Sequence, residues 1–158
     1  PVNSRTLEFV GVFGKSESEL LPLGEELSKI AGRPILVMPG KKCGQQANAQ
    51  QVAEATLRCM TRYVPAAVAV PGIVFLSGGQ SAEEATDNLN AMNAMGAHPW
   101  QVSFSYGQAL QAPVLAAWKG QESNVAAAQK ALLTRCELNG LARDGKYIRS
   151  MEAAGLKG

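Results

Sequence analysis

The residues best suited to chemistry lie in one short stretch, residues 71–81, with the sequence PGIVFLSGGQS. An apolar run rich in β-formers leads into Gly78 and Gly79, and Ser81 with Glu84 forms the S-x-x-E pattern of a helix capping box. A glycine turn that feeds a helix N-terminus offers unpaired backbone N–H groups to an anion. We therefore predict a strand buried on both faces, a turn and a helix. The turn has two interpretations, a phosphate site or simply a tight connection.

The other reactive side chains are scattered. Lys41 and Lys42 follow a short apolar stretch, where they either attract phosphate or lie in a solvated loop. The single histidine, His98, is interpreted as structural or solvent-facing. The three cysteines form no C-x-x-C pair, so we expect no disulfide framework, no metal and no other cofactor. This cysteine usage predicts a reducing intracellular compartment, either the cytoplasm or an organelle stroma or matrix.

Length and composition predict a single compact domain. The chain has 158 residues, of which 46% are hydrophobic, and a net charge of +2 that is spread along the sequence. This even spread predicts no nucleic-acid or membrane face. The longest apolar stretch, residues 64–76, contains two prolines and is too short to span a bilayer. The N-terminus shows no signal peptide, and a first residue of Pro1 suggests a processed chain or part of a longer one.

Strand and helix patterns alternate along the chain. This alternation predicts a parallel sheet with right-handed crossovers, in the order β-α-β-α-β-α-β-α-α. Four such strands form either a small open sheet or half of an eight-stranded barrel. Half a barrel leaves strand edges that need a protein partner or a second copy. The expected strands are 7–13, 34–38, 72–77 and 101–105, and the expected helices are 16–30, 48–63, 81–95, 107–120 and 123–140.

Apolar spacing predicts which side of the later helices is buried. In the helix over residues 81–95, Ala85, Leu89 and Met92 point inward. In the last helix the expected buried row is Val125, Ala128, Leu132 and Cys136. The charged tail from residue 143 onward is expected to be loosely held.

Several motifs resemble the C-terminal portion of class I fructose-bisphosphate aldolase. They are FLSGGQS at 75–81, SFSYG at 103–107, PGKKCGQQA at 39–47 and GKY at 145–147. The resemblance runs from about residue 33 to 147. It implies four parallel βα units like the C-terminal half of a TIM (β/α)₈ barrel, in a degenerate or truncated form.

The resemblance also implies a division of the chain. Residues 33–142 are the aldolase-like segment, and residues 143–158 are the tail. Residues 1–32 match nothing recognisable in the family and are expected to add a βα unit to the same sheet. We expect all three parts to form a single compact domain.

In the aldolase family, residues of the two turns hold a sugar phosphate. The matching positions here are Ser77, Gly78 and Gly107. The family pattern SYGRAL places an arginine where this chain has Gln108. An amide keeps a hydrogen bond but loses the charge and the bidentate fork, so phosphate binding is expected to be weakened.

The family's Schiff-base lysine has no counterpart in this sequence. The segment resembling LLKPNMVTPG aligns with residues 31–40, and Arg33 stands at the lysine position. A guanidinium stays protonated and cannot form an imine. The favoured hypothesis is an inactive, aldolase-like structural or assembly subunit of a larger complex. The alternative is a fragment or subunit of an active Schiff-base aldolase of glycolysis or carbon fixation.

Overall fold

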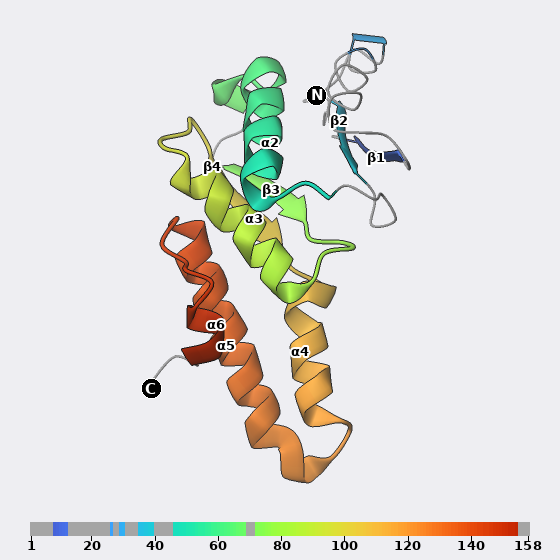
Figure 1. Cartoon of the computed structure of the whole chain (residues 1–158), viewed down its shortest axis with the longest axis vertical. Coiled ribbons are helices and arrows are strands. Elements are labelled where there is room, and N and C mark those ends of the chain that lie inside the picture. Colours follow the sequence, from blue (N-terminus) through green and yellow to red (C-terminus); the bar gives the residue numbers. More distant parts are fainter. Residues whose placement is uncertain are drawn as a thin grey trace. The chain divides into compact units, whose positions relative to one another are not determined.

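The computed structural model describes residues 8–12, 26, 29–30, 35–39, 46–68 and 72–154 (Figure 1). The chain divides into two compact units, residues 1–69 and residues 70–158, and each is described by itself. Arg33, Lys41, Lys42 and Cys43 lie outside the described residues.

The first unit contains one parallel strand pair and a capped helix. Strands β1 (Glu8–Val12) and β2 (Ile35–Pro39) pair along their full lengths. Helix α2 (Ala49–Tyr63) follows, and then the short 3₁₀ turn η1 (Ala66–Val68). The Asn48 side chain accepts a hydrogen bond from a first-turn N–H of α2, which confirms the cap predicted for this helix.

The second unit alternates strands with helices and ends in a helical segment. Strands β3 and β4 pair in parallel, with α3 between them in sequence. The parallel α/β class is thus confirmed, but four βα units on one sheet are not, because the described strands form two separate two-stranded sheets. The elements are β3 (Gly72–Leu76), α3 (Ala82–Ala94), β4 (Gln101–Ser105), α4 (Gln108–Trp118), η2 (Glu122–Asn124), α5 (Val125–Arg143) and α6 (Met151–Ala154).

Strand β3 is buried on one face and open on the other. Phe75 is buried and packs on Phe104, its register partner in β4, with ring centroids 6.0 Å apart. The neighbouring side chains of Val74 and Leu76 are 64% and 75% exposed. The prediction of a strand covered on both faces is therefore wrong. Successive side chains of a strand point to opposite faces, and these two point to the open one.

The predicted inward face of α3 is confirmed. Ala85, Leu89 and Met92 are buried, and α3 lies against β4 and α5. At the start of β3, Gly72 pairs with Gln101, and a Cβ at Gly72 would lie 2.3 Å from the Gln101 carbonyl oxygen. Only glycine fits this close approach of the two strands.

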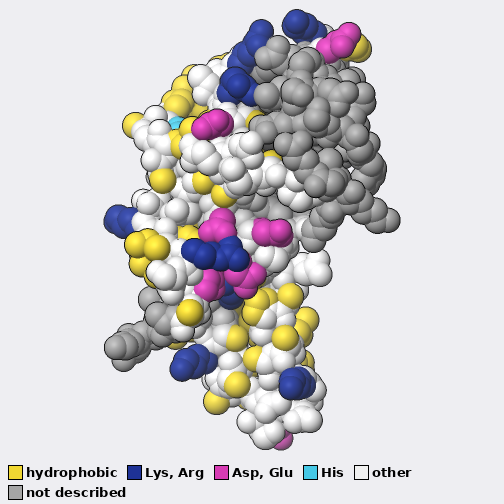
Figure 2. Space-filling model, viewed as in Figure 1, with side chains coloured by type: hydrophobic (Ala, Val, Ile, Leu, Met, Phe, Trp, Pro, Cys, Tyr) yellow, Lys and Arg dark blue, Asp and Glu magenta, His cyan; other side chains and the backbone are white. Residues whose placement is uncertain are grey.

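The predicted buried face of α5 is wrong except at one position. Only Ala128 of the expected row is buried, whereas Val125 and Leu132 are about two-fifths exposed and Cys136 is exposed. Figure 2 shows hydrophobic side chains at the surface where α4 and α5 run side by side. The buried residues of the helix are Ala128, Arg135, Leu138, Asn139 and Ala142. The buried side of α5 thus combines apolar residues with the polar Arg135 and Asn139, both of which are hydrogen-bonded to Thr86.

The segment after α5 is packed, which corrects the expectation of a loosely held tail as far as residue 154. Tyr147 is 5% exposed, and its backbone N–H donates to Asn90 Oδ1 at 2.9 Å. Glu152 receives two hydrogen bonds from Arg135. Charged residues hold this segment because Glu152 and Asp144 pair with arginines of α5 and Arg149 pairs with Asp87 of α3. No helix in the described part of the chain is long and apolar enough to cross a membrane.

Candidate phosphate-binding turns

The parallel register brings the two predicted phosphate-binding turns to one edge of the sheet. The last residues of the strands, Leu76 and Ser105, are register partners. Ser77 and Gly78 follow the first strand directly, and Gly107 lies two residues beyond the second. Carboxyl ends of parallel strands are a common location for ligand sites, because each is followed by a loop and a helix N-terminus.

The turn after β3 is closed by its own hydrogen bonds. The Gln80 N–H donates to the Ser77 carbonyl at 3.2 Å, and Gly79 has a φ of +81°, which only glycine adopts easily. Asn88 on α3 donates to the Gln80 side-chain oxygen at 2.8 Å. Ser77 is 3% exposed, whereas Gly78 is exposed. The two residues of this turn that are predicted to bind phosphate thus differ in their access to solvent.

Helix α3 begins with the predicted capping box. The Ser81 hydroxyl accepts from the Glu84 N–H at 3.1 Å, and the Glu84 carboxylate accepts from the Ser81 N–H at 2.6 Å. The Ser81 hydroxyl also donates to Glu83 at 3.0 Å. The pKa of the Glu83 carboxyl lies below its usual value, chiefly because it accepts a backbone hydrogen bond at its own residue. The Ser81 bond and the charges of two nearby arginines lower it further.

The turn after β4 leaves its helix uncapped. Gly107 is the N-cap of α4 and provides no side-chain hydrogen bond, although its carbonyl accepts from Leu110 and Gln111. Gly107 and Gln108 are both exposed. The first-turn N–H groups of α4 that precede Leu110 therefore receive no side-chain cap, and the helix dipole favours negative charge at this end.

Tyr106 lies between β4 and the uncapped helix. Its ring packs on Phe104 with centroids 5.6 Å apart. Its hydroxyl is buried and has no hydrogen-bond partner among the described residues. Burial raises the pKa of Tyr106, and the charge of Arg135 opposes this.

Sequence patterns missed a buried polar cluster between α3 and α5. Arg135 is 4% exposed and donates to Thr86 Oγ1 at 2.8 Å. The Thr86 hydroxyl also lies 2.7 Å from Asn139 Oδ1 and 2.8 Å from the Ala82 carbonyl oxygen. One signal was present: Arg135, Leu138, Asn139 and Ala142 have the i, i+3, i+4, i+7 spacing of a single helix face.

Comparison with known families bears directly on these turns. A family model described as "Glycolytic: Fructose-bisphosphate aldolase class-I" matches residues 27–157. The chain belongs to the class I fructose-bisphosphate aldolase family. The match is wider than the range of 33–147 expected from the motifs, and it includes both turns.

Curated relatives of the aldolase family match at about half identity. The chloroplastic fructose-bisphosphate aldolase of Oryza sativa subsp. japonica is 54% identical over 125 residues, covering 79% of this chain and 31% of the relative. Fructose-bisphosphate aldolase B of Sparus aurata is 52% identical over 122 residues, covering 77% and 33%. The chain thus spans about a third of the length of the relatives it matches.

A solved aldolase gives the same result in three dimensions. It is the fructose-bisphosphate aldolase of Plasmodium falciparum in complex with TRAP and a small-molecule inhibitor. It is 50% identical and has a TM-score of 0.65 over 72% of this chain and 34% of that one. The aldolase family has a TIM-barrel fold, and the described helices with their small parallel sheets are consistent with part of it.

Two of the three cysteines lie in the described part of the aldolase-like chain. Cys59 on α2 is half-buried and Cys136 on α5 is exposed, and both are free thiols. Burial raises the pKa of the Cys59 thiol, and the charge of Arg58 partly opposes this. No group of three or more His, Cys, Asp or Glu side chains gathers within the described ranges as a metal site would require.

Proposed function

We propose that these 158 residues supply the phosphate-binding strand ends of an aldolase-type barrel without forming the Schiff base themselves. They act as a structural or assembly subunit of a larger complex. The open face of β3 is the observation that carries this proposal. Val74 and Leu76 are exposed there, and β3 pairs only with β4 among the described strands. An apolar face and free strand edges require a protein partner or a second copy of the chain.

The absence of the nucleophile supports the non-catalytic part of the proposal. Schiff-base cleavage of a ketose bisphosphate needs an uncharged amine that attacks the substrate carbonyl. Arg33 occupies the position where the aldolase motif has lysine, and its guanidinium does not lose its proton at any relevant pH. Groups that act as a unit in catalysis are not lost singly at small cost.

The ligand proposed for the two turns is a sugar phosphate. Gly78, Gly107 and Gln108 are exposed at one sheet edge, and α4 has an uncapped N-terminus. Ser77 is buried beside them and would contribute its hydroxyl after a small opening of the turn. Because Gln108 replaces an arginine, we expect binding weaker than that of a site with a charged fork.

Borohydride trapping tests the proposal. The chain is incubated with fructose 1,6-bisphosphate and borohydride, and its mass is measured, with a lysine-containing aldolase as positive control. We expect no adduct on this chain. Size measurement of the purified chain is expected to give a stoichiometric complex or oligomer. A well-behaved monomer would contradict the assembly role.

The second candidate function is a piece or subunit of an active Schiff-base aldolase of glycolysis or carbon fixation. The alignment of both phosphate turns at one sheet edge favours it. A reduced adduct on any lysine of this chain would establish it and overturn the inactive interpretation.

The proposed location is a reducing compartment, either the cytoplasm or an organelle stroma or matrix. The free thiols of Cys59 and Cys136 support a reducing environment. The similarity to a chloroplastic rice aldolase supports the organelle alternative.

A further inference from the structure

Arg135 is the centre of a buried junction between α5, α3 and the segment that follows α5. Its Nη1 donates to Glu152 Oε2 at 2.7 Å, and its Nη2 donates to Glu152 Oε1 at 3.0 Å and to Thr86 Oγ1 at 2.8 Å. A guanidinium that is 4% exposed needs such pairing, because an isolated buried charge is very costly. The Glu152 carboxylate therefore fixes where the Arg135 fork points.

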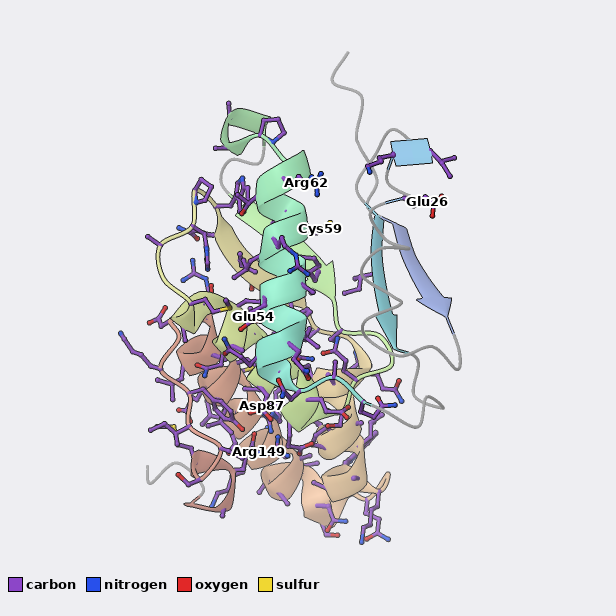
Figure 3. All side chains as sticks on the ribbon, turned by 45° about the horizontal axis from the view of Figure 1, so that its top comes forward. Glu26, Glu54, Cys59, Arg62, Asp87 and Arg149 are labelled. Carbon is purple, nitrogen blue, oxygen red and sulfur yellow. The ribbon has the colours of Figure 1, made fainter. Side chains whose placement is uncertain are left out.

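Residues 144–154, here called the strap, are attached to this junction at several points. The Tyr147 hydroxyl donates to Glu152 Oε1 at 2.8 Å, which orients the same carboxylate. The Tyr147 backbone N–H is bound by Asn90 on α3. At the surface, Arg149 of the strap pairs with Asp87 of α3, and Figure 3 shows the two side chains next to each other. The strap is thus held chiefly by groups on α3 and by Arg135.

The same junction reaches the first turn of α3. Thr86 accepts from Arg135 and lies 2.8 Å from the carbonyl oxygen of Ala82, the first residue of the helix. Arg135 Nη1 is also 4.0 Å from Glu83, which accepts a hydrogen bond from the Ser81 cap. Because only Gln80 and the N-cap Ser81 separate the two glycines from α3, we expect a shift of the first turn of the helix to move Gly78 and Gly79.

We propose that the strap is a latch. Docking of its Glu152 onto Arg135 sets the first turn of α3 and thereby the phosphate-binding geometry of the Ser77-Gly78 turn. This inference rests on the proposed role of that turn in holding phosphate. When the strap leaves, Arg135 loses its main counter-charge and is drawn toward Glu83. Arg135 then competes with the Ser81 hydroxyl for the Glu83 carboxylate. The released state therefore has a loosened turn and binds phosphate more weakly.

Two variants of Glu152 test the latch in the full 158-residue chain. Glu152→Ala removes the carboxylate. Glu152→Gln keeps the shape of the side chain and one acceptor oxygen, and it serves as the second variant in case Glu152→Ala does not fold. Glu137→Gln on the exposed side of α5 is the matched control. The measurements are amide hydrogen exchange of the strap, the amide NMR signals of Gly78 and Gly79, and titration with inorganic phosphate.

We expect exchange of the strap amides to rise about 100-fold in Glu152→Ala and about tenfold in Glu152→Gln, as for loss of one partner of a buried pair. The signals of Gly78 and Gly79 shift in both variants, phosphate binding weakens, and the control changes neither. Faster strap exchange with unchanged glycine signals would overturn the latch, as would an unchanged strap in both variants. A wild-type chain that binds no phosphate would instead overturn the proposed function, while the glycine signals would still decide the latch.

Discussion

The two turns at the sheet edge end neighbouring strands but start their helices in different ways. The turn after β3 leads into Ser81, whose hydroxyl and backbone are both satisfied by Glu84. The turn after β4 leads into Gly107, which has no side chain to cap α4. The first helix start therefore has a complete side-chain cap, whereas the second has none. We therefore expect an anion to bind more favourably at the start of α4 than at the start of α3.

The two helices also differ in how they are anchored. Arg135, Thr86 and Asn139 form the buried cluster that fixes α3 to α5. On α4 only Ala109 is buried, and Pro113 lies inside the helix and lacks the N–H that would continue the hydrogen-bond ladder. The difference suggests a division of roles. The turn after β3 provides a fixed reference, and the turn after β4 provides a helix start without a side-chain cap.

The largest test of this comparison removes the anchor of α3. In Arg135→Met, Glu152 loses its bidentate partner, so we expect the free energy of unfolding to fall by about 3 kcal/mol. Urea unfolding measures the change. Lys130→Met, an exposed position on the same helix, is the control and is expected to change it by less than about 0.5 kcal/mol. Equal losses in the two variants would contradict a specific anchoring role.

The second test concerns the backbone of the first turn. Gly79 has a φ of +81°, and a Cβ there meets no neighbouring atom within 4 Å, so strain alone decides the effect. Gly79→Ala is expected to lower the free energy of unfolding by about 1.5 kcal/mol. The control, Gly78→Ala, also has open space but no positive φ. Thermal or urea unfolding of both variants checks this, and a larger loss in Gly78→Ala would show that the turn has a different conformation.

Sequence patterns predicted most of the turn after β3 but not the buried cluster that fixes α3 to α5. The strand, the glycine turn and the capping box are local patterns, and each was found where it was expected. The buried face of α5 was missed because the apolar row with Leu132 outweighed a row containing Arg135. Burial of a guanidinium depends on Glu152 and Thr86, which are 17 and 49 residues away in sequence. Periodicity within one helix does not contain that information.

The exposure of Val74 and Leu76 was missed for a related reason. A continuous apolar run indicates a strand with two apolar faces, and it does not indicate whether another part of the molecule covers both. In the second unit, only one face of the β3–β4 pair is buried. The site residues themselves, such as Ser77 and Gly107, came from motif resemblance, because short glycine patterns alone are weak signals.

The third test addresses the accessible turn. Gln108→Arg would place a charged fork at the uncapped start of α4, and we expect phosphate to bind about tenfold more tightly. Gln111→Arg, in the same helix and also exposed, controls for the added charge. Calorimetric or NMR titration with inorganic phosphate gives both affinities. An equal gain in the two variants would mean that net charge, and not the position at the helix start, controls binding.

The smallest test exchanges the two kinds of helix start. Ser81→Ala removes the cap of α3 and is expected to lower the free energy of unfolding by about 1 kcal/mol. Gly107→Ser would give α4 a cap, since no atom lies within 4 Å of a new Cβ, and is expected to raise it by about 0.3 kcal/mol. The informative readout is phosphate affinity measured beside stability. If the open N–H groups of α4 attract the anion, the stabilising serine weakens phosphate binding, because its hydroxyl occupies the same donors. A variant that gains stability and binds phosphate as well as wild type would assign the anion to the turn after β3.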